Sequence, residues 1–299
     1  IMGNDNNSRT IVFIQSIVLS AIKKCGHPKL TIFADAHCAM STFSNQYPVL
    51  SRLGIRYRVI PVEFDHPFHF HPKAVLASGI NKAVLNVGSG NLTFGGWREN
   101  AEAWVKYDTE NDGNSTFVAF KKYLDEILNH VFLNESVQAE IEEAYDPTYH
   151  KWASTKENPS NLIFKMKKDK ALIDKMAESI ELTRPIYKLM ICSPYYDEEG
   201  KAIIKLKKKF NPGQIDIFIQ NGLLTLYPSA RKKLPADVNL HPVEFKNTNE
   251  ESIERRRFIH AKFYAVEQNK NITLFLGSAN CSNAALTISD EKGLIRTCF

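Results

Sequence analysis

The sequence predicts an α/β fold made of two homologous halves, each a mixed β-sheet flanked by helices. Three observations predict it. Short apolar runs alternate with helical segments along the chain, which is typical of sheets covered by helices. One set of polar residues recurs at a constant offset of 189 positions. The tetrapeptide PVEF also recurs, at 61–64 and 242–245, shortly before each copy of that set. Such repetition indicates an internal duplication.

The first half begins with an apolar run at 11–22, which we expect to lie within a buried helix over about 10–25. The run is too short to cross a bilayer. It lacks a charged leading region and a clear cleavage site, so a secretory signal peptide is the weaker alternative. Strands are then predicted for the apolar segments that follow, at 30–36, 56–64, 73–79 and 82–89, with a helix-like stretch between the first two.

A helical stretch from Ser115 to about Ala153 and a polar segment at 154–161 separate the halves, which predicts domains at 1–153 and 154–299. The second half repeats the alternation. Its predicted helices are 168–183 and the lysine-rich 202–210, and its predicted strands are 188–196, 216–220, 261–267 and 272–278.

The composition is that of an ordinary globular protein. Of 299 residues, 43% are hydrophobic and 24% charged, which is enough apolar material for a sizeable core. The net charge of +5 is mild, and the basic residues gather in runs at 165–170, 205–209, 231–233 and 255–257. The five cysteines are scattered without CxxC spacing, which favours free thiols in a reducing, cytoplasmic compartment.

The recurring polar residues form two sets, here named the first and second combs. The first comb is His71, Lys73, Ser89, Asn91 and Glu102. The second comb is His260, Lys262, Ser278, Asn280 and Glu291. Gly88 and Gly277, which precede the serines, keep the same offset. Because the repeated residues are polar rather than apolar, they indicate a functional site more than a repeated core.

Each comb places a histidine and a lysine two residues apart on a predicted strand, so that both side chains point to the same face. Imidazole, ammonium, hydroxyl and amide donors together suit a tetrahedral oxyanion such as phosphate. A carboxylate bonded to one ring nitrogen fixes the tautomer of a histidine and raises the basicity of the other nitrogen. Two facing combs would supply one histidine as nucleophile and one as proton donor, provided that both imidazoles meet in one cleft.

The motifs HPK…GSGN…E and HAK…GSAN…E resemble the two halves of the phospholipase D superfamily, whose hallmark is HxK followed by GSxN (the HKD motif). The resemblance covers essentially the whole chain. It implies a pseudo-two-fold pair of α/β halves with one active site at their interface. It also implies metal-independent phosphodiester hydrolysis without a cofactor, through a phosphohistidine intermediate.

Carried over residue by residue, the resemblance makes His71 the nucleophile and His260 the general acid. The lysines, serines and asparagines of both combs, Lys73, Lys262, Ser89, Ser278, Asn91 and Asn280, would bind phosphate. Glu102 and Glu291 would orient the histidines. Many lipid-cleaving members carry Asp five residues after the motif lysine, where this chain has Ser78 and Glu267. The later glutamate instead resembles the nuclease branch.

The leading functional prediction is therefore a hydrolase: a cytoplasmic endonuclease that binds and cleaves nucleic acid, DNA in preference to RNA. Basic residues Arg255, Arg256 and Arg257 lie just before His260 and are predicted to contact the phosphate backbone. The chain begins without Met, and we expect it to be part of a longer restriction or antiviral defence protein that carries further domains such as a helicase or ATPase. No membrane partner is expected.

Two alternatives remain open from the sequence: a lipid phosphodiesterase or phosphatidyltransferase, and an inactive nucleic-acid-binding module. Smaller signals are weaker. His66 and His69 are spaced like metal ligands, but no matching cluster occurs elsewhere, so no metal site is predicted. Tyr195 and Tyr196 either pack at the rim of the site or stack on a base. Trp97 and Trp104 flank Glu102 and are expected to pack around it.

Overall fold

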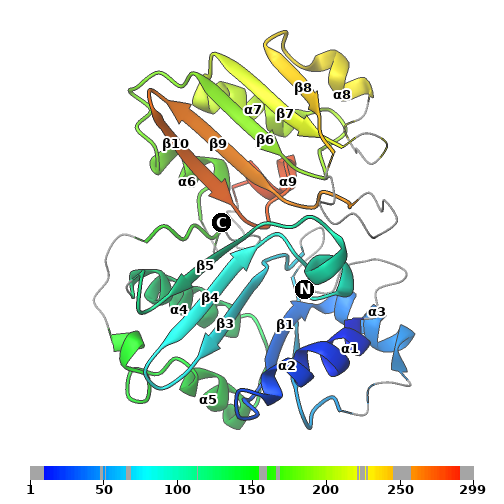
Figure 1. Cartoon of the computed structure of the whole chain (residues 1–299), viewed down its shortest axis with the longest axis vertical. Helices are drawn as coiled ribbons and strands as arrows, with labels where there is room; N and C mark the ends of the chain where they lie inside the picture. Colours follow the sequence, from blue (N-terminus) through cyan, green and yellow to red (C-terminus); the bar gives the residue numbers. More distant parts are fainter. Residues whose placement is uncertain are drawn as a thin grey trace, which may run out of the picture.

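The fold is mixed α/β, as the sequence predicts. The computed structural model describes residues 10–47, 50, 52–64, 69–112, 114–154, 160–165, 169–220, 222, 226, 228–244 and 257–289. Within these ranges the strands form three sheets, with strand orders β1-β2, β3-β4-β5 and β10-β9-β6-β7-β8. Figure 1 shows the five-stranded sheet in one body of the molecule and the two smaller sheets in the other.

The N-terminal part has its own small core. Its elements are α1 (Thr10–Phe13), a π-helical turn (Ile14–Val18), α2 (Leu19–Lys23), β1 (Thr31–Asp35), α3 (Ala36–Asn45) and β2 (Arg58–Val62). The first three form one continuous helix over the predicted segment, and Ile11 and Ile14 on it are fully buried. They pack with Ile32 and Ala34 of β1, and β1 pairs with β2 in parallel.

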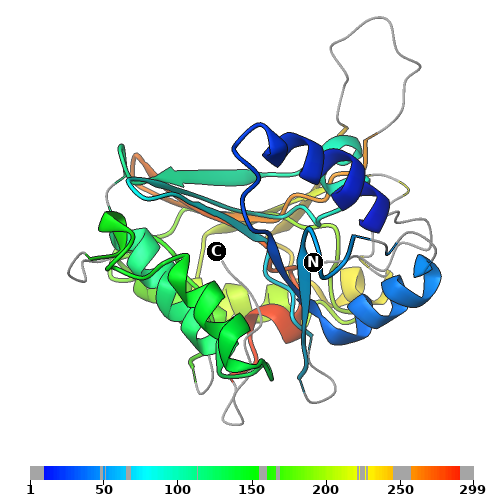
Figure 2. The same ribbon diagram turned by 90° about the horizontal axis from the view of Figure 1, so that it is seen from below.

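An antiparallel three-stranded sheet follows. Its elements are β3 (Ala74–Ser78), β4 (Ala83–Gly88), a π-helical turn (Gly95–Glu99), β5 (Trp104–Asp108), α4 (Ser115–Leu128), α5 (Glu135–Glu143) and a 3₁₀ turn (Lys151–Ser154). Figure 2 shows α4 and α5 together on one side of this sheet. Their contact is apolar, because Phe117 and Tyr123 of α4 share a core with Leu85 and Val87 of β4.

The first half therefore differs from the single mixed sheet that the sequence predicts. The β1-β2 pair and the β3-β4-β5 sheet are separate. Ile60 and Val62 of β2 nevertheless share the α4 core with Leu85 and Val87 of β4, so the two sheets are separate in backbone pairing and continuous in packing. Leu162 and Phe164 also pack in the α4 core, so the chain leaves that core after Phe164.

The second half forms one mixed sheet, as predicted. Its elements are α6 (Leu172–Glu178), β6 (Lys188–Cys192), α7 (Lys201–Phe210), β7 (Gln214–Ile219), α8 (Pro228–Lys233), β8 (Val238–Pro242), β9 (Phe263–Gln268), β10 (Asn271–Leu276) and α9 (Asn283–Leu286). The strands β6, β7 and β8 are parallel, and the β9-β10 hairpin joins β6 in antiparallel register. Buried Ile203 and Leu206 of α7 pack against Ile191 and Ile217 of the sheet.

The two halves meet along a short stretch of backbone just before β9. Ala101 and Ile259 form an isolated parallel bridge. The Ala101 nitrogen donates to the Phe258 oxygen at 2.8 Å, and the Ala101 oxygen accepts from the nitrogens of His260 and Ala261 at 2.9 and 3.0 Å. This bridge fixes the segment that carries Glu102 against the segment that carries His260.

Candidate functional site

Both combs are mounted on equivalent hairpins. The histidine and lysine of each comb lie on the extended segment directly before β3 or β9, rather than inside the strand as the sequence suggests. The glycine before each comb serine then bonds back to the comb lysine. The Gly88 nitrogen donates to the Lys73 oxygen at 3.0 Å, and the Gly277 nitrogen donates to the Lys262 oxygen at 3.2 Å. The hairpin register therefore holds the residues of each comb together.

Glycine is required at the first of these positions. A Cβ atom on Gly88 would lie 2.5 Å from the Ala103 oxygen and 2.5 Å from the Trp104 ring. The close approach of β5 to the end of β4 depends on the missing side chain, and it brings Ser89 to the strand that follows Glu102. The Ser89 hydroxyl accepts from the Ala103 nitrogen at 2.9 Å.

Each lysine contacts the histidine of its own comb. Lys262 Nζ lies 2.8 Å from His260 Nε2 and donates to the His260 oxygen at 2.6 Å. Lys73 Nζ lies 3.1 Å from His71 Nε2 and donates to the His71 oxygen at 3.1 Å. Lys73 and Lys262 are 3% and 0% exposed, so these ammonium groups lie at the base of the site rather than on the surface.

The carboxylate of the first comb serves the histidine of the second. Glu102 Oε1 lies 2.7 Å from His260 Nδ1, and Ser89 donates its hydroxyl proton to Glu102 Oε2 at 2.5 Å. With Nδ1–H bonded to the carboxylate, Nε2 of His260 is left with its lone pair, directed toward Lys262. The sequence predicts that Glu102 orients a histidine but does not show which one. In the structure Glu102 of the first half contacts His260 of the second half.

Burial controls the charge of this cluster. The pKa of His71 falls well below its usual value because the imidazole is desolvated and lies near the charges of Lys73, Lys262 and His260. Burial also lowers the pKa of His260, against the opposing effect of Glu102. Burial lowers the pKa of Lys262 from 10.5 to about 7. For Glu102, burial would raise the pKa, but the contacts with His260 and Ser89 outweigh it and the net pKa is lowered.

The asparagines of both combs share one feature. Asn91 Oδ1 and Asn280 Oδ1 are buried, and neither has a hydrogen-bond partner among the described residues. A buried amide oxygen without a donor costs about 1–3 kcal/mol. The same unpartnered acceptor occurs at two equivalent positions, so a group that satisfied it would have to be a hydrogen-bond donor.

The loop after Asn91 gives a testable prediction about this arrangement. A Cβ on Gly96 would lie 2.5 Å from the Asn91 nitrogen, whereas a Cβ on the neighbouring Gly95 meets nothing nearer than 3.5 Å. We expect Gly96→Ala to destabilise the protein by about 3 kcal/mol, because backbone must move to accept the methyl group. Gly95→Ala is the matched control and should be near neutral. Urea unfolding measures both, and equal stability of the two variants would contradict the prediction.

Three predicted site residues lie outside the described residues, namely Glu291, Arg255 and Arg256, and so does His66, for which no metal site is predicted. Arg257 is described, and its backbone oxygen accepts from Gln220 Nε2 at 2.7 Å. Its predicted contact with a phosphate backbone stays a prediction. Within the described ranges, no cluster of three or more His, Cys, Asp or Glu side chains is arranged to hold a metal ion.

Two positioning residues escaped the sequence interpretation. Asp35, at the end of β1, caps α3 through the Cys38 nitrogen at 3.1 Å and accepts from the Phe70 nitrogen at 3.0 Å. It therefore fixes the residue before His71. Gln220 Oε1 accepts from the Ile259 nitrogen at 2.8 Å, which fixes the residue before His260. A polar residue just after a strand is the only signal that could have indicated them.

The flanking aromatic residues divide into packing and rim positions. Tyr196 is 6% exposed and belongs to the core, whereas Tyr195 is 42% exposed and its ring centroid lies 6.2 Å from that of His260. The ring centroids of Trp97 and Trp104 lie 6.0 Å apart, and Trp97 remains 51% exposed, so their expected packing around Glu102 stays a prediction.

No helix within the described ranges combines the length and apolar character needed to cross a bilayer.

Comparisons with known proteins give a likeness to solved structures alone. No family model matches the chain, and no curated protein matches it. A solved structure that resembles it is the crystal structure of polyphosphate kinase from Porphyromonas gingivalis, with 12% sequence identity and a TM-score of 0.48. The match covers 96% of this chain and 38% of that chain, so this chain spans less than half of the kinase chain.

This finding corrects the family and the function predicted from the sequence. The structure found is named as a kinase, not as a phospholipase D or a nuclease, and no family model supports the predicted superfamily. We therefore withdraw the superfamily assignment, the endonuclease activity with its DNA-binding and defence attributes, and the two alternatives tied to them. The physical reason is that a comb specifies a local polar cluster, and a local cluster determines neither family nor substrate.

Proposed function

We propose that this chain is a phosphoryl-transfer enzyme in which the two combs form one site and a histidine carries the phosphoryl group between donor and acceptor. The observation that carries the proposal is the 2.7 Å contact between Glu102 of the first comb and His260 of the second. It joins the polar residues of both combs in one cluster. The proposal includes a pseudo-two-fold relation between two halves, at about 1–153 and 154–299.

The chemistry follows from the neutral imidazoles. Because the pKa values of His71 and His260 are both lowered, each ring keeps a lone pair at neutral pH. In the first step, Nε2 of His71 attacks phosphorus, the N–P bond forms, and the P–O bond to the leaving group breaks. His260, protonated in the donor complex, gives its proton to the leaving oxygen. In the second step, an acceptor oxygen attacks phosphorus, its proton goes to His260, and the N–P bond breaks.

The remaining comb residues stabilise the charge on the phosphoryl group. The ammonium groups of Lys73 and Lys262 are already fixed beside the ring nitrogens, so they need little reorganisation to bind phosphoryl oxygens. A bound dianion raises the pKa of nearby basic groups. Lys262 and His260 are therefore both protonated in the complex, and His260 then has the proton that it must donate. Asn91 and Asn280 would donate to phosphoryl oxygens through their amide nitrogens, because an amide oxygen only accepts.

The proposal is tested by trapping the phosphorylated protein. We expect at least one of four donors (ATP, inorganic tripolyphosphate, acetyl phosphate or phosphoramidate) to label the protein with acid-labile, base-stable phosphate. Mass spectrometry under alkaline conditions locates the label, and titration with orthovanadate measures anion binding at the same site. The proposal fails if no donor labels a comb histidine and vanadate does not bind.

A further inference from the structure

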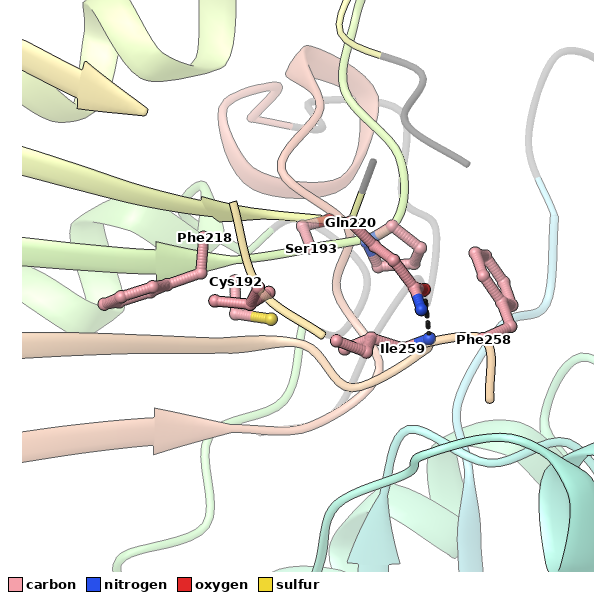
Figure 3. Close-up of a pocket in the computed structure, with 8 residues that line it drawn as sticks. Cys192, Ser193, Phe218, Gln220, Phe258 and Ile259 are labelled. Atoms are coloured by element: carbon pink, nitrogen blue, oxygen red, sulfur yellow. Dashed lines mark hydrogen bonds between the residues drawn. The ribbon is translucent and has the colours of Figure 1, made fainter. Parts of the chain in front are cut away.

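A hollow lies beside His260 on the side of the second half. It encloses only about 10 Å³, room for roughly one water molecule, and the remaining space among its lining atoms opens to solvent. Figure 3 shows Phe218 and Cys192 on one side of it and Phe258 on the other, with Gln220 reaching to the backbone at Ile259. Since Phe258 and Ile259 directly precede His260, the hollow opens next to the proposed site.

The polar groups around this hollow are already engaged. Both ends of the Gln220 carboxamide bind the backbone of Arg257 and Ile259. The Ser193 hydroxyl donates to the Tyr195 oxygen at 2.9 Å and accepts from the Cys281 nitrogen at 3.0 Å. Burial raises the pKa of Cys192 to about 11, so its thiol is neutral. The lining therefore favours an uncharged group that needs few hydrogen bonds.

Aromatic rings connect the hollow to the reacting centre. The Phe258 ring centroid lies 5.8 Å from that of His260, and the Tyr195 centroid lies 6.3 Å from Phe258 and 6.2 Å from His260. Tyr195 is 42% exposed, so one part of its ring faces solvent at the rim. An aromatic surface of this kind stacks on planar rings with little dependence on their hydrogen-bonding pattern.

We propose that the rings of Tyr195 and Phe258, beside this hollow, form a stacking subsite for a planar aromatic ring on the phosphorylated substrate, either a nucleobase or a simple aryl group. This inference rests on the proposed function, because it takes the phosphoryl group of the same substrate to lie at His260. Tyr195 is a specificity-determining residue in this proposal, since it contacts the part of the substrate that does not react.

The test compares ligands that share phosphates and differ in the ring. We expect wild-type protein to bind ATP about 10-fold more tightly than inorganic tripolyphosphate, because stacking on one ring contributes about 1–3 kcal/mol. Tyr195→Ala should bring this ratio close to one, and Tyr195→Phe should keep it. Tyr149, which is also exposed but lies outside the site, provides the control, and Tyr149→Ala should keep the wild-type ratio. Calorimetric titration of each ligand gives the ratios.

A second pair of ligands identifies the source of the ring. If 4-nitrophenyl phosphate binds more tightly than methyl phosphate while ATP gains nothing over tripolyphosphate, the ring is a simple aryl group. The subsite is overturned if neither ring-bearing ligand binds more tightly than its ring-free partner, or if Tyr195→Ala weakens both members of a pair equally. Labelling by phosphoramidate, which has no ring, reports on phosphoryl transfer separately, so the two proposals can fail independently.

Discussion

His71→Ala should abolish covalent labelling of the protein and lower phosphoryl transfer by roughly 10⁴-fold or more, because the substitution removes the proposed nucleophile. The imidazole is the group whose pKa is held well below its usual value, so at neutral pH it is unprotonated and competent to attack phosphorus. Rapid quench with a labelled donor, followed by mass spectrometry of the intact protein, measures the loss.

His260→Ala should behave differently. It removes the proposed proton donor, so labelling should persist but slow by about 10²–10⁴-fold. A donor with a good leaving group, such as acetyl phosphate, should lose less than ATP. His37, an exposed residue of α3, offers the matched control, and His37→Ala should keep both rates. If His71→Ala is labelled normally and His260→Ala is not, the two roles are reversed. If both variants are labelled normally, the proposed mechanism is wrong.

The sequence predicts the local parts of the site well. The hairpins at 74–88 and 263–276 follow from apolar runs separated by short polar turns, and such patterns depend on neighbours in the chain. The offset of 189 positions identifies the combs, because each comb lies on one hairpin and the loop after it. The helices at 115–128 and 201–210 are recovered for the same local reason.

Contacts between distant segments could not be predicted. Nothing in the sequence pairs Glu102 with His260, because their contact depends on the backbone bridge between Ala101 and Ile259. The separation of the β1-β2 pair from the β3-β4-β5 sheet escaped prediction because apolar patterning does not show which strands pair. Ile60 and Val62 of β2 lie in the same core as Leu85 of β4 although β2 does not pair with that sheet. The β5 strand was missed as well. It begins at Trp104, only two residues after a comb glutamate, where no clear alternation marks it.

The basic runs show why clustered charge in a sequence is weak evidence for a nucleic-acid partner. Lys207 and Lys209 of the lysine-rich helix pair with Asp237 and Asp174, and Lys233 pairs with Glu199. Lys165, from another run, is 1% exposed and donates to the Ile288 oxygen at 2.6 Å. A run of like charge in a sequence does not show where its opposite charges lie, and here many lie on neighbouring elements of the same fold.

Lys262→Met should stabilise the protein by roughly 4 kcal/mol at pH 7 while it weakens binding of phosphate analogues. The lysine is fully buried, and burial lowers its pKa from 10.5 to about 7. Between these two pH values the unfolded chain holds a proton that the folded protein has released, so the free energy of unfolding rises with pH by up to about 1.4 kcal/mol per unit. Below pH 7 the folded protein bears the full cost of the buried charge. Methionine has a similar length and carries none of that cost.

The pH dependence distinguishes this explanation from a general packing effect. Urea unfolding at pH 7 and at pH 10 should show the advantage of Lys262→Met shrinking from roughly 4 to below about 1 kcal/mol. At pH 10 the folded protein holds the lysine neutral, and the pH is only half a unit below the unfolded pKa of 10.5, so little of the cost remains. Lys82, on the exposed turn between β3 and β4, supplies the control, and Lys82→Met should follow the wild-type slope. Saturating orthovanadate should flatten the slope of the wild-type protein, because a bound anion raises the pKa of Lys262 toward its unfolded value. If the free energies of unfolding of Lys262→Met and wild type differ by the same amount from pH 7 to pH 10, the folded protein does not hold the lysine neutral. The stability difference would then be unrelated to anion binding.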